Sequence, residues 1–464
     1  MIALTLGEIA GIVDGGLAAG ADPALVVDGP AFLDSRRPAA GGLFAAFDGA
    51  NADGHDFAAA AVEAGAAAML GSRDVGVPGV IVPDVEAALG RLARELLRRL
   101  PETTVIALTG SSGKTSTKDL LGQLLATHAP TVFTEGSFNN EIGLPLTVLR
   151  ADGDTRFLLL EMGARGVGHI KQLCELAPPK VGLVLNIGTA HVGEFGSREI
   201  TATAKGELIE ALPKDGLAVL NADDDYVARM AQRTSAPVVW FGEQPSARVQ
   251  AKGVDIDENG CAGFTLSADG VEAPVRLRFV GEHQVSNALA AAAVCIGMGM
   301  SVSEIASAMD AAEPLSGGRM SVTHRADGVI VIDDAYNANP ESMRAGLKAL
   351  VTLARSRPEG RSWAVLGQMA ELGETSAEAH DALGRLAVRL RVDRVLAVGA
   401  EARMIHAGAQ HEGSGGQESA TVADPDEAIA VLREELRPGD VVLVKASNSV
   451  GLRRVARALL EDAR

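Results

Sequence analysis

One short segment of the sequence carries residue types that could bind a nucleotide. Its residues are Thr109, Gly110, Ser111, Ser112, Gly113, Lys114, Thr115 and Ser116. The segment lies between an apolar strand expected over 104–108 and an amphipathic helix expected to begin near Thr115. In this setting, glycines permit a tight turn, backbone N–H groups at the helix start cradle phosphates, and Lys114 neutralises phosphate charge. The Thr115 hydroxyl would be a ligand for Mg²⁺.

The loop is a shorter variant of the commonest phosphate-binding pattern, GxxxxGK[ST], because Leu108 stands where that pattern has its first glycine. The alternative interpretation is a glycine-rich turn with an exposed lysine. The strand before the loop and the helix after it favour nucleotide binding, but leave hydrolysis, kinase chemistry, transport and ligation open.

Glu161 and His191 form a second candidate group, since each comes at or after the end of an apolar strand. The carboxyl ends of parallel strands share one edge of a sheet, so both residues could face the nucleotide. Together with Thr115 they would suit Mg²⁺ or Mn²⁺ beside phosphates. Taken singly, Glu161 could equally be a solvated cap and His191 a structural histidine. Lys205, on an expected helix, could be an ordinary surface charge or the ion-pair partner of Glu207.

The elements that would position these residues fall into three α/β sections, with expected boundaries 1–100, 101–313 and 314–464. The first mixes short strands over 43–47 and 80–82 with helices over 57–69 and 86–100. In the second, strands that alternate with helices predict a mostly parallel sheet covered on both faces. These strands are expected over 104–109, 157–161, 182–186 and 217–221.

Hairpin signals at 258–260 and 269–270 add an antiparallel appendage over 245–280, and helices follow over 284–297 and 303–311. The third section repeats the strand and helix alternation, which predicts a Rossmann-like, doubly wound sheet. Its strands are expected over 329–333, 363–367, 395–399 and 441–445.

The composition limits the class of protein. The chain has 464 residues and a formal net charge of −18, from 42 Lys and Arg against 60 Asp and Glu, so it offers no general footprint for nucleic acid. Cys174, Cys261 and Cys295 are far apart and form no CxxC pair, which favours a reducing compartment such as the cytoplasm. The longest apolar run, 288–300, is shorter than the roughly 20 residues needed to span a bilayer, so no membrane insertion is expected.

Seven motifs of the sequence resemble those of the Mur ligase family. They are TGSSGKTSTK at 109–118, SFNNEIGLPLTVL at 137–149, EMGARGVGHI at 161–170, NIGTAHVGEFGS at 186–197, AKGE at 204–207, DDAYNANPESM at 333–343 and GQMAELG at 367–373. The similarity runs from Asp34 to Lys445. It implies three domains: a small UDP-binding domain, a central ATP-binding domain and a C-terminal Rossmann-like domain that binds the incoming amine.

The resemblance also implies an activity. In this family ATP phosphorylates the carboxylate of a UDP-linked peptide, and an amine attacks the acyl phosphate to form an amide. More narrowly, the seven motifs look like those of the members that join D-alanyl-D-alanine to UDP-N-acetylmuramoyl-tripeptide. The implied cofactors are ATP and Mg²⁺, with two ions expected and Mn²⁺ as a substitute, and the implied protein is a monomer.

Several residues receive roles from this resemblance alone. Lys205 matches a lysine that CO₂ carbamylates, which would make it an anionic metal ligand beside Glu161 and His191. His283 and Asn287 match the segment that contacts adenine. Arg319 and Asp334 match positions that approach the phosphates and ribose when the domains close.

The substrate-binding residues are also implied by the resemblance. Ser35, Arg36 and Phe47 resemble the UDP-sugar site, where an arginine can bind a diphosphate through two hydrogen bonds. Four polar residues are expected to contact the peptide or dipeptide substrates: Asn139, Tyr336, Asn337 and Asn339. Two alternatives remain. A tripeptide-forming Mur ligase or a folylpolyglutamate synthase shares the middle-domain chemistry, and a nucleotide-dependent switch or silent binding module would bind ATP without forming an amide.

Overall fold

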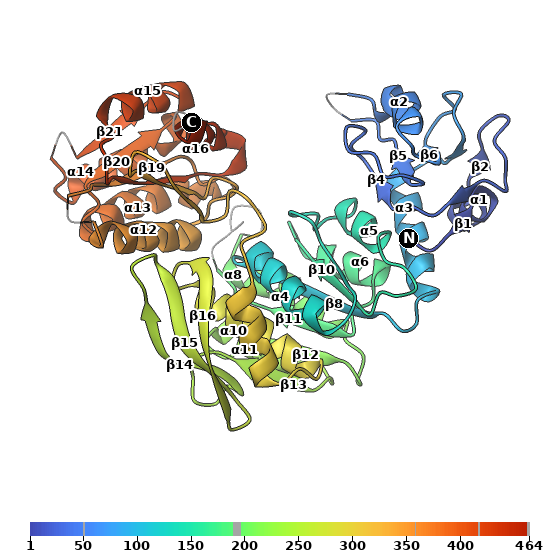
Figure 1. The fold of residues 1–464 in the computed structure, drawn as a ribbon, viewed down its shortest axis with the longest axis horizontal. Helices are drawn as coiled ribbons and strands as arrows, with labels where there is room; N and C mark the ends of the chain where they lie inside the picture. Colours follow the sequence, from blue (N-terminus) through green and yellow to red (C-terminus); the bar gives the residue numbers. More distant parts are fainter. Residues whose placement is uncertain (50–51, 189–195, 358, 416–417, 462–464) are drawn as a thin grey trace.

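A computed structural model describes residues 1–49, 52–188, 196–357, 359–415 and 418–461. The chain forms three α/β domains, with the N-terminal and C-terminal domains at opposite ends of the central one (Figure 1). The three-domain α/β fold expected from the sequence is therefore confirmed. No helix in the described ranges is long and apolar enough to cross a membrane.

The N-terminal domain contains a five-stranded sheet in the order β2-β7-β6-β5-β4, beside a two-stranded ladder of β1 and β3. Its strands are β1 (Leu4–Thr5), β2 (Gly16–Leu17), β3 (Val26–Val27), β4 (Ala31–Phe32), β5 (Leu43–Ala45), β6 (Ala68–Gly71) and β7 (Gly79–Ile81). Its helices are α1 (Leu6–Val13), α2 (Ala58–Glu63) and α3 (Val85–Arg98).

The expected helix over 57–69 is wrong in its second half. Helix α2 ends at Glu63, and Gly65 follows with φ 110°, a conformation that suits glycine and breaks the helix. The next residues form β6, which is buried along its whole length between β5 and β7. Tertiary burial outweighs the helix propensity of the alanine-rich sequence here.

The central domain is built on a nine-stranded sheet in the order β16-β15-β14-β13-β12-β11-β8-β10-β9. Its strands are β8 (Thr104–Thr109), β9 (Thr131–Phe133), β10 (Phe157–Glu161), β11 (Val181–Val184), β12 (Leu217–Asn221), β13 (Val238–Phe241), β14 (Val249–Ile256), β15 (Cys261–Ala268) and β16 (Val271–Val280). Strands β8 to β13 pair in parallel, and β8 lies between β10 and β11. The expected antiparallel appendage is confirmed as the β14-β15-β16 meander, which continues the central sheet because β14 pairs in parallel with β13.

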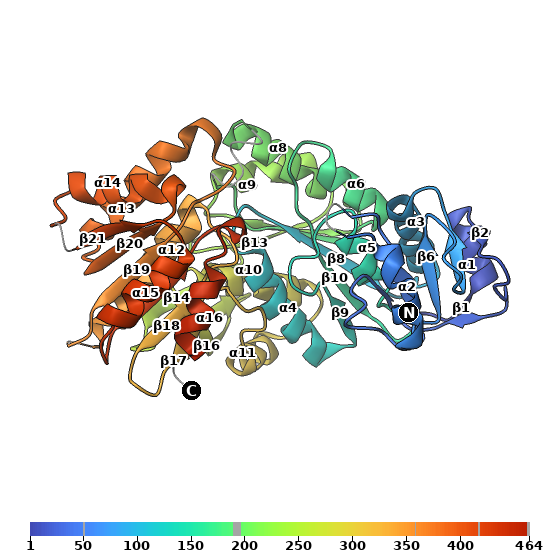
Figure 2. The same ribbon diagram turned by 90° about the horizontal axis from the view of Figure 1, so that it is seen from above.

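Helices cover both faces of this sheet (Figure 2). One face carries α4 (Lys114–His128), α10 (Gln284–Gly297) and α11 (Val302–Ala311). The opposite side carries α5 (Gly143–Val148), α6 (His169–Leu176), α8 (Arg198–Glu210) and α9 (Asp225–Arg229). This two-sided cover explains why the parallel strands are almost continuously apolar.

The C-terminal domain is doubly wound, as expected. Its sheet has the order β17-β18-β22-β19-β20-β21. The strands are β17 (Ser321–His324), β18 (Ile330–Asp333), β19 (Ser362–Leu366), β20 (Arg394–Val398), β21 (Ser419–Val422) and β22 (Val441–Lys445). Helices α12 (Pro340–Arg355), α13 (Ser376–Arg389) and α14 (Arg403–His411) pack on one face, and α15 (Pro425–Glu435) and α16 (Arg453–Glu461) on the other.

The two junctions between domains differ. Helix α3 packs against α5 and α6, and a single hydrophobic core continues from the N-terminal domain into the central one. The C-terminal domain follows a linker that is held on α4 by a reciprocal pair of hydrogen bonds. In that pair Gln123 Nε2 donates to the Glu313 carbonyl at 2.9 Å and Glu313 N–H donates to Gln123 Oε1 at 3.0 Å. In addition, Val280 at the end of β16 joins the C-terminal core.

Candidate active site

The predicted phosphate loop connects β8 to the first turn of α4. Gly113 adopts φ 79°, and a Cβ at this position would lie 2.5 Å from Asn287 Oδ1 on α10, so another residue would be strained and would force Asn287 or the loop to shift. Lys114 Nζ donates to the Gly110 carbonyl at 2.7 Å, which holds the ammonium over the loop. The strand, glycine turn and helix therefore have the arrangement that the sequence predicted.

The loop suits a phosphate group. The Ser111 hydroxyl is buried, and among the described residues nothing forms a hydrogen bond with it. A buried polar atom of this kind is costly unless a ligand or water satisfies it. The first N–H groups of an α-helix also lack partners within the helix, and α4 begins at Lys114. The donors present thus match the acceptor oxygens of a nucleotide phosphate.

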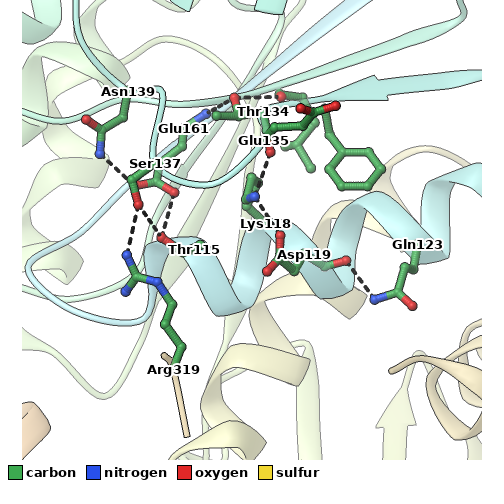
Figure 3. A network of polar contacts seen from close by, with 12 residues as sticks. Thr115, Lys118, Asp119, Gln123, Thr134, Glu135, Ser137, Asn139, Glu161 and Arg319 are labelled. Carbon is green, nitrogen blue, oxygen red and sulfur yellow. Dashed lines mark hydrogen bonds and ion pairs between the residues drawn. The ribbon is translucent and has the colours of Figure 1, made fainter. Parts of the chain in front are cut away.

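A compact polar cluster lies beside the loop (Figure 3). Thr115 Oγ1 donates to Glu161 Oε2 at 3.0 Å and lies 3.3 Å from Ser137 Oγ. Asn139 Nδ2 donates to the other Glu161 oxygen at 2.7 Å. Glu161 is almost completely buried at the carboxyl end of β10, which neighbours β8. Sheet topology therefore brings Thr115 and Glu161 together although 46 positions separate them.

The chemistry of this cluster fits a magnesium ion. No group of three or more His, Cys, Asp or Glu side chains in the described ranges could hold a metal ion by itself. Mg²⁺, however, is usually bound by one or two protein oxygens together with water and substrate phosphates. Thr115 and Glu161 supply two such oxygens beside the phosphate loop. His191 lies outside the described residues.

Lys205 faces the same cleft from α8 and is almost fully buried. Burial, and then the nearby Lys114 ammonium, hold the pKa of Lys205 well below its usual range. Its sequence neighbour Glu207 has another function, because its carboxylate accepts from Gly168 N at 2.6 Å and Lys171 N at 3.0 Å and so caps α6. The alternative that Lys205 pairs with Glu207 is therefore wrong.

The C-terminal domain contributes a second set of charges. The Arg319 guanidinium carbon lies 4.3 Å from the Tyr336 ring centroid, and Arg319 also donates to Ser137 Oγ of the central domain at 2.9 Å. Asp334 forms a buried ion pair with Lys445, Nζ to Oδ2 2.5 Å, and accepts from Met320 N at 3.1 Å. These contacts fix the linker segment and β22 around the same cleft.

One cleft of about 950 Å³ collects most of the predicted site residues. Those that line it are Ser111, Ser112, Gly113, Lys114, Thr115, Ser116, Asn139, Glu161, Lys205, His283, Asn287, Arg319, Asp334, Tyr336, Asn337 and Asn339. Thr109 and Gly110, the first two residues of the loop segment, do not line the cleft, and Thr109 Oγ1 donates to the Met162 carbonyl at 2.8 Å. Burial lowers the pKa of His283, so its imidazole is more readily neutral than usual.

The three N-terminal candidates, Ser35, Arg36 and Phe47, do not line this cleft. Arg36 is exposed and pairs with Asp34 at 2.8 Å. Among the described residues of the N-terminal domain, Leu33 alone lines the cleft. The structure therefore brings the described central and C-terminal candidates together and leaves the N-terminal group apart from them.

Sequence reasoning assigned no role to three residues of the site: Ser137, Asn186 and Lys445. Asn186 Oδ1 accepts from Ser112 N at 3.0 Å and so braces the phosphate loop. Both Asn186 and Lys445 come at or just after the carboxyl end of a parallel strand. The same position at a strand end predicted Glu161, and it is the signal that could have identified Asn186 and Lys445.

The chain matches three domain families over most of its length. They are described as "Mur ligase family, catalytic domain" over residues 32–96, "Mur ligase middle domain" over 108–295 and "Mur ligase, glutamate ligase domain" over 318–448.

Individual relatives match all or nearly all of the chain. A Mycobacterium tuberculosis protein named UDP-N-acetylmuramoyl-tripeptide--D-alanyl-D-alanine ligase is 51% identical, covering 100% of this chain and 98% of its own. The crystal structure of MurF from Acinetobacter baumannii superposes with a TM-score of 0.85 at 31% identity, over 99% of both chains. The MurF ligase of Thermotoga maritima, in complex with ADP, superposes with a TM-score of 0.76 at 31% identity, over 94% of this chain and 97% of that one. The chain therefore belongs to the Mur ligase family, in the MurF branch.

Proposed function

We propose that this chain is an ATP-dependent amide ligase that joins D-alanyl-D-alanine to UDP-N-acetylmuramoyl-tripeptide, releasing ADP and phosphate. The product is the pentapeptide precursor of peptidoglycan. One observation supports this proposal above the others: the phosphate loop and Glu161 of the central domain share one cleft with Arg319 and Asp334 of the C-terminal domain. Ligation requires such a shared cleft, because the activated carboxylate and the incoming amine have to meet beside the nucleotide.

The chemistry explains why the site is rich in cations. A carboxylate is a poor electrophile, and transfer of the terminal phosphate of ATP to it supplies a leaving group. Lys114 and Arg319 would stabilise the negative charge of the phosphates during this transfer. Bound Mg²⁺ would neutralise phosphate charge, and two ions are proposed, with Mn²⁺ able to take the same oxygen ligands. Thr115, Glu161 and His191 would hold these ions.

We propose that Lys205, once carbamylated, is a metal ligand in addition to Thr115, Glu161 and His191. An amine whose pKa is lowered by burial is more readily neutral, and a neutral amine can add to CO₂. The nitrogen then forms a bond to carbon and loses a proton, which converts the side chain into an anionic carbamate. An anionic oxygen donor in this position would attract a divalent ion that an ammonium group would repel.

The three domains would divide the substrates among them. We propose that residues 1–100 bind the UDP-sugar-peptide through Ser35, Arg36 and Phe47, that 101–313 bind ATP, and that 314–464 bind the dipeptide. Thr109 to Ser116 would bind the phosphates of ATP, His283 and Asn287 its adenine, and Arg319 and Asp334 its phosphates and ribose. The dipeptide and the peptide end of the first substrate would contact Asn139, Tyr336, Asn337 and Asn339. We further propose a cytoplasmic monomer.

The test is phosphate release by the purified protein with ATP and Mg²⁺, while each substrate is omitted in turn and the product mass is recorded. The expected result is release that requires both substrates, with a product heavier than the tripeptide substrate by the dipeptide less water. Meso-diaminopimelate and glutamate, offered as alternative amines, separate this activity from that of related ligases. Release without a dipeptide requirement, or ATP binding without a new amide, would contradict the proposal.

Three variants test the assigned residues: Lys114→Ala, Glu161→Ala and Lys205→Ala. Each is expected to abolish ligation while the protein stays folded. Lys252→Ala is a suitable control, because Lys252 is exposed on β14 and pairs only on the surface, with Glu272 at 2.6 Å. Full activity in all three site variants would refute the assignment of these residues.

A further inference from the structure

Lys118 is a buried lysine for which the proposed chemistry has no use. It lies on α4, one turn after Thr115, with 1% of its side chain exposed. Its ammonium donates to the Thr134 carbonyl at 2.6 Å, pairs with Asp119 Oδ1 at 2.5 Å and lies 5.8 Å from the Phe133 ring centroid (Figure 3). Burying an ammonium is unfavourable unless its partners are well placed, so these contacts determine where the side chain lies.

The Thr134 carbonyl, which accepts from Lys118, lies at the start of the irregular segment 134–139. Thr134 Oγ1 accepts from Glu161 N at 3.2 Å, so the buried start of the segment is joined to β10. At the other end, Gly163 N donates to the Asn139 carbonyl at 2.8 Å. Between these two anchors, Gly136 adopts φ 54° and the backbone forms no helix or strand. The anchors therefore determine where the side chains of the segment point.

Two of those side chains reach the metal-binding candidates. Ser137 Oγ lies 3.3 Å from Thr115 Oγ1, and Asn139 Nδ2 donates to Glu161 Oε1 at 2.7 Å. The Lys118 side chain forms no hydrogen bond or ion pair with Thr115 or Glu161 among the described residues, and it does not line the cleft. Its connection to the site is the segment that it anchors.

We propose that Lys118 is a positioning residue, whose ammonium fixes segment 134–139 so that Ser137 and Asn139 orient Thr115 and Glu161 for a Mg²⁺-nucleotide complex. This inference deepens the proposed function and rests on it for the identity of the ligand. Groups that orient metal ligands commonly change metal affinity or activity by about 10-fold to 100-fold when they are replaced.

The test uses Lys118→Met in the full-length protein, with ADP binding measured by calorimetry in the presence of Mg²⁺ and again in EDTA. We expect Mg²⁺ to increase the affinity of the unaltered protein for ADP. In Lys118→Met, this Mg²⁺-dependent gain in affinity should fall by about 10-fold or more. Binding in EDTA should stay unchanged. Lys118→Arg, which keeps the charge, should recover part of the gain.

The matched control is Lys252→Met, which removes an exposed lysine from an ion pair in the same domain and should behave as the unaltered protein. If Lys118→Met alone unfolds because Asp119 is left unpaired, the double variant Lys118→Met/Asp119→Asn removes both charges and takes its place.

Two results would overturn the inference: an unchanged Mg²⁺-dependent gain in a folded variant, or an equal loss of ADP affinity with and without Mg²⁺. Failure of the ligation assay with unaltered protein would instead refute the proposed function. The calorimetric comparison does not depend on ligation, so the two failures are distinguishable.

Discussion

Arg319 donates from the linker of the C-terminal domain to the Ser137 hydroxyl of the central domain at 2.9 Å, across 182 positions of sequence. The same guanidinium lies 4.3 Å from the Tyr336 ring centroid. Arg319 is thus held between the wall of the phosphate site and the segment proposed to bind the dipeptide. Its position couples the two halves of the cleft.

Replacing Arg319 should therefore reduce turnover. We expect Arg319→Ala to lower kcat by about 100-fold, since a positioned cationic donor beside phosphates is lost. Arg319→Lys should recover only part of the activity, because an ammonium lacks the planar group that stacks on Tyr336. Initial rates at varied ATP concentration measure this effect.

Arg454→Ala is the control for this substitution, because Arg454 is exposed on α16 and pairs with Asp426 at 2.6 Å. Rates for Arg319→Ala within twofold of the unaltered protein would show that the contact with Ser137 has no part in the reaction.

Gly113→Ala should weaken nucleotide binding. The new Cβ would meet Asn287 Oδ1 at 2.5 Å, and alanine would have to adopt the positive φ of this position, so Asn287 or the loop has to shift. We expect the Kd for ADP to rise about 10-fold or more, measured by calorimetry. Gly253→Ala is the control, because Gly253 has φ 62° but no atom within 4 Å of the new Cβ, and it should leave the Kd unchanged. An equal rise in both variants would mean that the loss of affinity is a general effect of a strained glycine substitution and not a property of the phosphate loop.

His380 should make the stability of the C-terminal domain depend on pH. The side chain is buried, His380 Nε2 accepts from Met369 N at 2.9 Å, and burial holds its pKa below the usual 6.5. Between those two pKa values the unfolded chain binds more protons than the folded chain, so stability is lost as the pH falls below about 6.5.

The variant His380→Leu cannot titrate at this position and leaves the Met369 N–H without its acceptor. At pH 7.5 we expect it to be less stable by about 1–3 kcal/mol, and we expect the difference to shrink as the pH is lowered to 5. Urea unfolding across this pH range measures both quantities. A constant difference would contradict the assignment of a neutral, accepting imidazole.

Local signals made much of the fold predictable. The strand, glycine loop and helix around Lys114 follow one another within a few residues, and each is typical of its element. The Asp269-Gly270 turn predicted the hairpin between β15 and β16, and both residues adopt positive φ, 51° and 80°. Parallel-strand topology correctly predicted that Glu161 would lie beside the loop.

Other features depend on tertiary contacts that no local pattern displays. Lys118 is part of a helical sequence in which a lysine is normally exposed, and only the segment packed over α4 explains its burial. The alanine-rich residues before β6 favour helix, but β6 itself is a strand because it pairs with β5 on one side and β7 on the other. The contact between Arg319 and Ser137 requires the arrangement of two domains, which sequence spacing does not encode.

The continuous core between the N-terminal and central domains has a consequence for how the polypeptide is made. Helix α3 covers α5 and α6, and Leu176 comes within 3.4 Å of where a Cβ on Gly90 would lie. In a chain growing from its N-terminus, the part of the apolar side of α3 that contacts α5 and α6 therefore stays exposed until the residues of α6 have left the ribosome. The first 100 residues alone do not bury this part of α3, so during that interval it is an exposed apolar surface of the kind that chaperones bind.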